Sequence, residues 1–245
     1  MTLAGCSALV TGASSGIGAA LAGQLADRGC RLVLVGRDER RLSRTAERTG
    51  GRALVADLTG ASDLARVASA AREVDLLVNN AGGGWAGELA DMPAEELPRL
   101  VEANLLAAAE LTRSALPPMR RRGRGHLVFV SSVAALGVAE EAVYSATKAG
   151  LRAFAASVRH EAEPSGVGVA TVLPGAVRTP FFDGRGRPYD RRFPRQVAPE
   201  RVARAIVRSV ERGGGETFVP AWLGAAARVQ AVAPELFHRL SRRFG

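Results

Sequence analysis

Short apolar segments alternate along the chain with longer segments whose apolar residues recur at helical spacing. Unbroken runs of this kind are typical of strands buried on both faces of a parallel sheet. Six runs predict strands, at 6–11, 31–36, 52–57, 75–80, 125–132 and 166–174, and a further short run lies at 216–220. The longer segments predict helices at 16–28, 39–48, 61–72, about 94–119, about 144–163, 199–213 and 223–243.

Strand–helix alternation predicts right-handed βαβ units and therefore a sheet with helices on both faces. We expect an α/β fold with one doubly wound, mainly parallel sheet of seven strands. No linker or repeat divides the chain, so residues 1–245 are predicted to form one domain. Pro98 would break a helix begun at Pro93, and the long helix is therefore expected to start near Pro98.

Composition is ordinary for a globular protein, with 47% hydrophobic and 23% charged residues. No apolar run reaches the length of a membrane-spanning helix, and the first residues lack the pattern of a signal peptide. Cys6 and Cys30 precede predicted strands and are interpreted as buried free thiols. These features indicate a cytoplasmic protein.

Basic charge is concentrated in the last quarter of the chain. The net charge is +9, and residues 178–245 contain fourteen arginines against six acidic residues. Such a region could attract an acidic ligand, a carrier protein or a membrane surface. We favour arginines on solvated helix faces, and no recognition motif accompanies the charge, so nucleic acid is not expected as a partner.

The segment TGASSGIG, residues 11–18, joins the first predicted strand to the first helix. Gly12, Gly16 and Gly18 have the spacing required where the backbone approaches a pyrophosphate and the helix packs on the sheet. The helix N-terminus would then hold the phosphates. The motif predicts a Rossmann-like dinucleotide site.

The end of the second strand bears on the choice of cofactor. An acid at this point usually binds the ribose 2′-hydroxyl of NAD, but the chain has Gly36 followed by Arg37. An arginine suits a 2′-phosphate, so NADP(H) is predicted over NAD(H). Asp38 is expected to cap the next helix. Asp57, at the end of the third strand, is placed to contact the adenine. The alternative is that it caps the helix that follows it.

Tyr144 and Lys148 lie four residues apart in YSATK, and Lys148 is the only lysine in the chain. Residues four apart share one face of a helix. Since arginine is used everywhere else, the lysine suggests a task for a compact ammonium. An ammonium about 5 Å from a phenolate would favour it by about 3 kcal/mol at an effective dielectric of 20. We therefore expect a lowered Tyr144 pKa and proton transfer near neutral pH.

The chain resembles the short-chain dehydrogenase/reductase family over nearly its whole length up to PGAVRTP. The resemblance rests on several motifs in order: TGASSGIG, NNAG at 79–82, VEANLLAAAELT with Asn104, VSS, YSATK, and PGAVRT at 174–179. It completes the set of predicted cofactor-binding residues, which is Gly12, Ser14, Ser15, Gly16, Ile17, Gly18, Arg37, Asp57, Leu58, Asn80, Ala81, Gly82, Tyr144, Lys148, Pro174, Gly175, Val177 and Thr179.

The resemblance also implies catalytic roles. Tyr144 would be the general acid in reduction and the base in oxidation. Lys148 would hold the nicotinamide ribose, Ser132 would donate a hydrogen bond to the substrate oxygen, and Asn104 would anchor a water linked to Lys148. The family usually spaces serine and tyrosine by 13, which fits Ser131, but the strand phase favours Ser132.

Residues 180–198 lie where the family has its substrate lid, and residues 199–245 are predicted to form the C-terminal helices. The resemblance implies an NADP(H)-dependent oxidoreductase acting on a small carbonyl or alcohol, with a non-catalytic NADP-binding sensor or scaffold as the alternative. The lid arginines would suit an anionic or carrier-linked substrate, although solvated lid residues are the simpler interpretation. A homo-oligomer, dimer or tetramer, is expected, and no metal site is predicted from the scattered histidines, of which His126 is placed at a strand edge.

Overall fold

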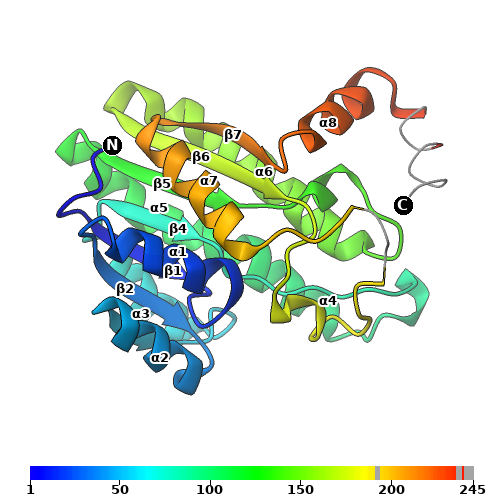
Figure 1. Ribbon diagram of the computed structural model, residues 1–245, viewed down its shortest axis with the longest axis horizontal. Coiled ribbons are helices and arrows are strands. Elements are labelled where there is room, and N and C mark those ends of the chain that lie inside the picture. The colour runs from blue at the N-terminus through cyan, green and yellow to red at the C-terminus, as the bar shows by residue number, and fades with distance from the viewer. Residues whose placement is uncertain (191–193, 236–238, 240–245) are drawn as a thin grey trace.

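A single seven-stranded parallel sheet forms the centre of the molecule (Figure 1). The structure is a computed structural model, and it describes residues 1–190, 194–235 and 239. The strand order is β3-β2-β1-β4-β5-β6-β7, and every neighbouring pair is parallel. The strands are β1 (Ser7–Thr11), β2 (Arg31–Gly36), β3 (Arg52–Val55), β4 (Leu76–Asn79), β5 (Gly125–Val130), β6 (Val167–Pro174) and β7 (Gly214–Val219).

Helices cover both faces of this sheet, as the strand–helix alternation predicted. The helices are α1 (Gly16–Ala26), α2 (Glu39–Thr49), α3 (Ala61–Ala71), α4 (Glu96–Val101), α5 (Ala107–Arg122), α6 (Ala142–Ala162), α7 (Pro199–Glu211) and α8 (Leu223–Val232). Buried residues of α1, α2 and α7 share one hydrophobic cluster with the sheet, and those of α3, α5 and α6 share the other.

Strand β5, which lies inside the sheet between β4 and β6, shows why the apolar runs are almost unbroken. Leu127 and Phe129 belong to one cluster, whereas Val128 and Val130 belong to the other. Successive side chains on a strand point to opposite faces, so a strand covered on both faces needs apolar residues at every position. The prediction of a doubly wound α/β fold is confirmed, and the sheet is parallel throughout.

Three irregularities interrupt the predicted helix at about 94–119. Helix α4 starts at Glu96, two residues before Pro98, whose missing N–H falls in the unpaired first turn. A π-helical turn, η2 (Glu102–Leu106), then separates α4 from α5. Pro117 and Pro118 lie inside α5, which continues to Arg122. Pro117 and Pro118 therefore do not end α5.

The C-terminal part is only partly described. Helix α8 ends at Val232, just before Pro234, whereas a helix had been predicted over 223–243. The parts of that prediction at 236–238 and 240–243 and the lid residues 191–193 lie outside the described residues. Within the described part of the chain, no helix combines the length and apolar character that a membrane crossing requires.

The order of the strands locates the functional edge of the sheet. The chain runs outward from β1 to β3 in one direction and from β4 to β7 in the other, so β1 and β4 lie at the point where the order reverses. Ligands of open α/β sheets bind outside the carboxyl ends of the strands at this point. TGASSGIG, NNAG and the serine pair each follow a carboxyl end there.

Candidate active site

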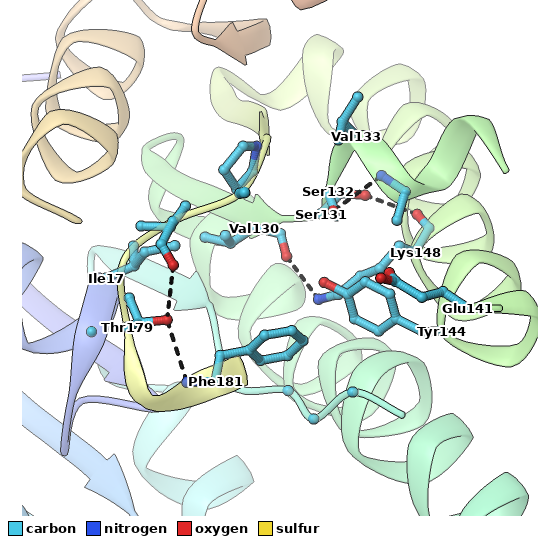
Figure 2. A pocket seen from close by; sticks show the side chains of 18 of the residues that line it. Ile17, Val130, Ser131, Ser132, Val133, Glu141, Tyr144, Lys148, Thr179 and Phe181 are labelled. Atoms are coloured by element: carbon cyan, nitrogen blue, oxygen red, sulfur yellow. Dashed lines mark hydrogen bonds between the residues drawn. The ribbon is translucent and has the colours of Figure 1, made fainter. Parts of the chain in front are cut away.

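A cavity of about 1780 Å³ runs along the carboxyl edge of the sheet. Its walls are the loop after β1, the end of β2, and the loops after β3, β4, β5 and β6. One end lies beside Arg37 and Asp57, and the other contains Tyr144, Ser132 and Phe181 (Figure 2). The cavity thus connects the predicted cofactor loop with the predicted catalytic residues.

The glycine loop is shaped by close backbone contacts. Gly12 has a φ of +68°, a conformation that favours glycine, and a Cβ there would lie 2.8 Å from Asn80 Nδ2. A Cβ on Gly18 would lie 2.2 Å from the Gly12 carbonyl oxygen. Asn80 Nδ2 donates to the Thr11 carbonyl at 2.8 Å and so fixes the NNAG loop to β1. The loop therefore presents bare backbone at the start of α1, as a pyrophosphate requires.

Gly36, the last residue of β2, provides no carboxylate at the position where an NAD-binding acid usually lies. A Cβ at Gly36 would lie 3.2 Å from Ser14 Oγ. Arg37 Nη1 lies 3.7 Å from Asp57 Oδ2, and both side chains line the cavity. Asp57 accepts from Thr59 N and Oγ1 at 3.0 and 2.8 Å. It is not the cap of α3, which is Gly60, whereas Asp38 caps α2 as predicted.

The charge of Asp57 is stabilised at this position. Partial burial acts to raise its pKa, but the hydrogen bonds from Thr59 and the charge of Arg37 outweigh burial and hold the pKa below its usual range. The side chains of Arg37 and Asp57 are 62% and 45% exposed, and an ion pair in such a position is weak. Arg37 is therefore available to a ligand phosphate.

Helix α6 presents Tyr144 and Lys148 to the cavity, one turn apart, as their spacing predicted (Figure 2). Both side chains are buried, at 9% and 4% exposure. Lys148 Nζ donates to the carbonyl oxygen of Val130 at 3.1 Å and lies 5.8 Å from the centre of the Tyr144 ring. The lysine is thus held against the end of β5 beside the tyrosine.

The prediction that Lys148 lowers the Tyr144 pKa is wrong for this structure. Burial, the largest effect, raises the pKa of Tyr144 well above its usual value, and the charge of Glu141 raises it further. The Ser132 hydroxyl and the charge of Arg185 lower it, but by less. Burial also lowers the Lys148 pKa to about 8. Desolvation therefore dominates both shifts, and Tyr144 is a neutral phenol.

The two adjacent serines face different partners. Ser131 Oγ donates to the carbonyl oxygen of Lys148 at 2.9 Å, which ties β5 to α6. Ser132 Oγ accepts from Ala134 N at 3.1 Å and caps the short helix η3 (Val133–Leu136). The Ser132 hydroxyl hydrogen remains available and interacts with Tyr144. Ser132 is thus the serine that faces Tyr144, and its catalytic role stays a prediction.

Asn104 lies in the π-helical turn η2, behind the cavity wall. Its Nδ2 donates to the Gly83 carbonyl and to Thr147 Oγ1, each at 3.0 Å, and its Oδ1 accepts from Gly83 N at 2.8 Å. The side chain is 1% exposed. Asn104 therefore joins the loop after β4 to helix α6, next to Lys148.

Most predicted site residues line the one cavity. The exceptions are Gly18, which supports the glycine loop from behind, and Asn104. Thr179 packs on the glycine loop, since a Cβ on Gly16 would lie 2.9 Å from Thr179 Cγ2. The predicted residues that line the cavity are Gly12, Ser14, Ser15, Gly16, Ile17, Arg37, Asp57, Leu58, Asn80, Ala81, Gly82, Ser132, Tyr144, Lys148, Pro174, Gly175, Val177 and Thr179.

Sequence reasoning missed two parts of the cavity. Glu141 precedes Tyr144 by three residues and lines the same space, which its position on the helix face could have indicated. Trp222 and Val229, near and on α8, line the end beyond the lid. Nothing in their spacing relates them to the motifs, because α8 reaches the cavity only through the fold of the chain.

The sequence matches the family model for short chain dehydrogenases over residues 7–189. The chain belongs to the short-chain dehydrogenase/reductase family. It is 35% identical to the ketoacyl reductase HetN of Nostoc sp. over 228 residues, which cover 89% of this chain and 79% of that protein. The enzyme is therefore an NAD(P)-dependent oxidoreductase that acts on CH–OH and C=O groups, as its family does.

Solved structures of the family share the whole fold. A short-chain dehydrogenase from Sphingobium yanoikuyae in complex with NADPH has a TM-score of 0.84 and 34% identity, covering 96% of this chain and 95% of that one. A family member from Burkholderia phymatum in complex with NAD also has a TM-score of 0.84, at 27% identity, with 96% of each chain covered. Relatives thus bind either nicotinamide cofactor.

Proposed function

We propose that this short-chain dehydrogenase/reductase reduces a ketone or aldehyde with NADPH, with Tyr144 as the proton donor. The observation that carries the proposal is the meeting of Tyr144, Ser132 and Lys148 at one end of the cavity that begins at the glycine loop. A binding module would not need these three groups in one buried place. The raised pKa of Tyr144 supports the neutral form that a general acid requires.

The glycine loop, Arg37 and Lys148 would hold the cofactor, which when bound would supply the hydride for the carbonyl carbon. Tyr144 donates its phenolic proton to the carbonyl oxygen, and in oxidation it takes that proton back. Ser132 donates its hydroxyl hydrogen to the same oxygen, and this hydrogen bond strengthens as negative charge develops there. The bond from Ala134 N holds the Ser132 oxygen in place for this role.

Lys148 replaces the proton that Tyr144 loses. One hydrogen of its ammonium is directed at the Val130 carbonyl, which leaves others for a ribose hydroxyl and for a proton path. Because burial lowers the pKa of Lys148 to about 8, the ammonium releases a proton readily near neutral pH. We propose that Asn104 anchors a water on this path, since it braces Gly83 and Thr147 beside Lys148.

Replacement of Tyr144 by Phe tests the assignment. A panel of ketones, aldehydes and acyl thioesters is followed by NADPH absorbance, and the wild type should oxidise NADPH with at least one of them. Tyr144→Phe should lose turnover by at least about 10²-fold while binding NADPH with unchanged affinity. Turnover that persists would show that another group donates the proton. A wild type that binds NADPH but reduces no carbonyl would favour the sensor or scaffold.

The preference for NADPH rests on the ribose end of the cavity. Gly36 adds no carboxylate against a 2′-phosphate, the nearby Asp57 is paired with Arg37 at 3.7 Å, and Arg37 lines the cavity with 62% of its side chain exposed. Arg41 also lines the cavity, but it is paired with Asp38 at 3.2 Å, so the proposal rests on Arg37. A charge-assisted hydrogen bond is worth about 1.5–3 kcal/mol, which predicts an NADPH preference of about 10- to 150-fold in kcat/KM.

Kinetics with both cofactors test this preference. Arg37→Gln should lose most of it, whereas Arg44→Gln, on the helix that follows Arg37 but outside the cavity, should keep it. Gly36→Asp with Arg37→Val should reverse it, because the new carboxylate would accept from the ribose diol of NADH. Equal or better use of NADH by the wild type would mean that Asp38 or another group reads the ribose.

We propose that the substrate is uncharged next to its carbonyl group. Arg185 and Arg187 of the lid are paired with Glu141 and Glu140, so neither supports the alternative of an anionic or carrier-linked substrate. Phe181 and Glu141 line the space around Tyr144 and would disfavour a carboxylate there. Rates of reduction of two matched ketones, one with and one without a carboxylate, distinguish an anionic from an uncharged substrate. Faster reduction of the keto acid would contradict the proposal.

We also propose a cytoplasmic homo-oligomer. Cys6 and Cys30 are free thiols with sulfur atoms 3.0 Å apart, which favours a reducing compartment. Trp222, Val229 and Val232 are 47%, 37% and 86% exposed, and apolar side chains of this kind are commonly covered in an assembly. Sedimentation should give the mass of a dimer or tetramer, and a monomer at micromolar concentration would exclude it.

A further inference from the structure

A buried arginine lies in the lid segment, which we define as residues 180–190. Arg185 forms an ion pair with Glu141, and the two side chains are only 7% and 14% exposed. The neighbouring pair, Arg187 with Glu140, joins the same two segments but is 53% and 47% exposed. Exposed pairs contribute little, whereas the loss of one partner of a buried pair leaves an uncompensated charge.

The guanidinium of Arg185 is fixed by further contacts. Its Nε donates to the Arg187 carbonyl at 3.0 Å, which closes the lid segment on itself. Its plane lies over the Phe182 ring, with 4.7 Å between the guanidinium carbon and the ring centre. The main-chain carbonyl of Arg185 accepts from Ala86 N at 2.9 Å. One residue thus connects the lid to the loop after β4 and to the turn before α6.

Aromatic rings continue this set of contacts to the catalytic residue. Phe182 packs edge-on against Phe181 at 5.5 Å between ring centres, and Phe181 lies 5.5 Å from the Tyr144 ring (Figure 2). Glu141 is the residue before α6, and its carbonyl accepts from Ser145 N at 2.7 Å. The ion pair and the rings therefore approach Tyr144 from both sides of the substrate space.

We propose that Arg185 and Glu141, the lid pair, are positioning residues that hold Phe181 and Phe182 against Tyr144 and so set the apolar wall that a substrate's substituent contacts. This inference rests on the proposed carbonyl reduction. The lid pair acts through the rings and does not touch the reacting atoms. The substrates it selects carry an aryl or bulky alkyl group on the carbonyl carbon.

Loss of Glu141 and loss of Arg185 should shift the Tyr144 pKa in opposite directions. The charge of Glu141 raises the Tyr144 pKa and that of Arg185 lowers it. The charged groups around Tyr144 that line the cavity are Glu141, just before α6, Lys148 of α6, and Arg99 of α4, which is paired with Glu96, and Arg185 of the lid pairs with Glu141. The two single variants therefore differ in a way that a common loss of packing would not produce.

The experiment compares Arg185→Met, Glu141→Gln and the double variant with Arg187→Met and Glu140→Gln as matched controls. Each single lid-pair variant should raise KM for an aryl ketone about tenfold, with a smaller change in kcat. In alcohol oxidation, where Tyr144 accepts the proton, the pH profile of Glu141→Gln should move to lower pH and that of Arg185→Met to higher pH. The double variant should have a KM close to that of the wild type, because no unpaired charge remains.

Hydrogen exchange of the lid amides gives a readout that does not require activity. Exchange at 180–190 and at Ala86 should be faster in both single variants and unchanged in the two controls. Lid-pair variants that match the controls in KM, pH profile and exchange would overturn the inference. If exchange behaves as expected but the wild type reduces no carbonyl, the proposed function fails while the positioning of the rings stands.

Discussion

Tyr144 and Lys148 show how burial changes the chemistry of single residues. An exposed ammonium near a phenol would lower the phenol's pKa, but both side chains here lie inside the protein. Burial raises the pKa of Tyr144 and lowers that of Lys148 to about 8, so Tyr144 is a neutral phenol while Lys148 stays an ammonium that loses its proton more easily than an exposed lysine. A neutral phenol beside an ammonium of low pKa is suited to donate a proton to a carbonyl. The ammonium of Lys148 can then return a proton to Tyr144.

Lysine at position 148 is predicted to be irreplaceable by arginine. Lys148 Nζ lies 3.4 Å from where a Cβ on Gly82 would be, and the side chain is 4% exposed, so a guanidinium has no room there. Lys148→Arg should lower kcat/KM by at least about 10²-fold, because the larger guanidinium would misplace the ribose contacts and does not release a proton. Arg152→Lys, one turn along the same helix and paired with Glu216, is the control and should keep its activity.

The serine pair makes a second prediction at this scale. Ser132→Ala removes the hydrogen-bond donor beside Tyr144 and should reduce kcat by about 10²- to 10³-fold. Ser131→Ala removes only the bond to the Lys148 carbonyl and should cost about 1 kcal/mol of stability with a small change in kcat. Steady-state kinetics and urea unfolding of both variants measure these effects. The opposite order in kcat would identify Ser131 as the catalytic serine.

Among the elements, the π-helical turn η2 has a clear structural consequence. It places Asn104 between Gly83 and Thr147, so that one buried amide joins two walls of the cavity. π-helical turns of this type occur frequently at functional sites. The lid is a second such element, because its helix η5 (Pro180–Phe182) directs Phe181 toward Tyr144 and toward the loop after β4.

Contact between these elements predicts a strict requirement for glycine at position 84. A Cβ there would lie 2.5 Å from Phe181 Cζ, and the ring cannot retreat because Tyr144 and Phe182 pack on it. Gly84→Ala should lower kcat/KM about tenfold, the size of a modest overpacking penalty. Gly184→Ala, with open space around the new methyl group, should leave kcat/KM unchanged.

A smaller side chain at position 181 should offset the loss of activity caused by Gly84→Ala. Gly84→Ala combined with Phe181→Leu should recover activity relative to Gly84→Ala alone, because leucine leaves room for the methyl group. Steady-state kinetics of the single and double variants measure the recovery. No recovery would mean that the methyl group acts on the glycine's own loop and not on the lid.

At the scale of the whole molecule, the centre of the sheet contains a histidine where the sequence suggested an edge. His126 lies in β5 between β4 and β6, is 1% exposed, and its Nε2 has no hydrogen-bond partner among the described residues. Space for its ring comes from Gly168, where a Cβ would lie 2.3 Å from His126 Nδ1. Burial, helped by the charge of the N-terminus, lowers its pKa to about 4.

This histidine predicts acid sensitivity. Because its pKa is about 4 in the folded protein and 6.5 in the unfolded chain, the unfolded chain binds more protons between these values. Its stabilisation is therefore complete above pH 6.5 and is lost as pH falls toward 4, by about 3 kcal/mol. Urea unfolding at pH 7 and 4 should show that His126→Gln removes this part of the loss. His160→Gln, at an exposed position, should behave as the wild type, and equal losses in all three proteins would contradict the assignment.

The sequence by itself determined the parts of this protein whose signal is local. Apolar runs buried on both faces identified the strands, and glycine spacing after the first strand located the cofactor loop. The interval of four between Tyr144 and Lys148 placed both on one helix face. Each of these properties depends on residues close together in the chain and on backbone geometry that repeats between proteins.

Tertiary structure alone decided the properties that depend on surroundings. The direction of the Tyr144 pKa shift follows from desolvation, which the sequence does not record. The pairing of Arg185 with Glu141, 44 residues away, and the place of α8 beside the cavity follow from the path of the chain. Burial and contact between distant segments are properties of the packed molecule, because they arise only when the sheet brings its carboxyl ends to one edge.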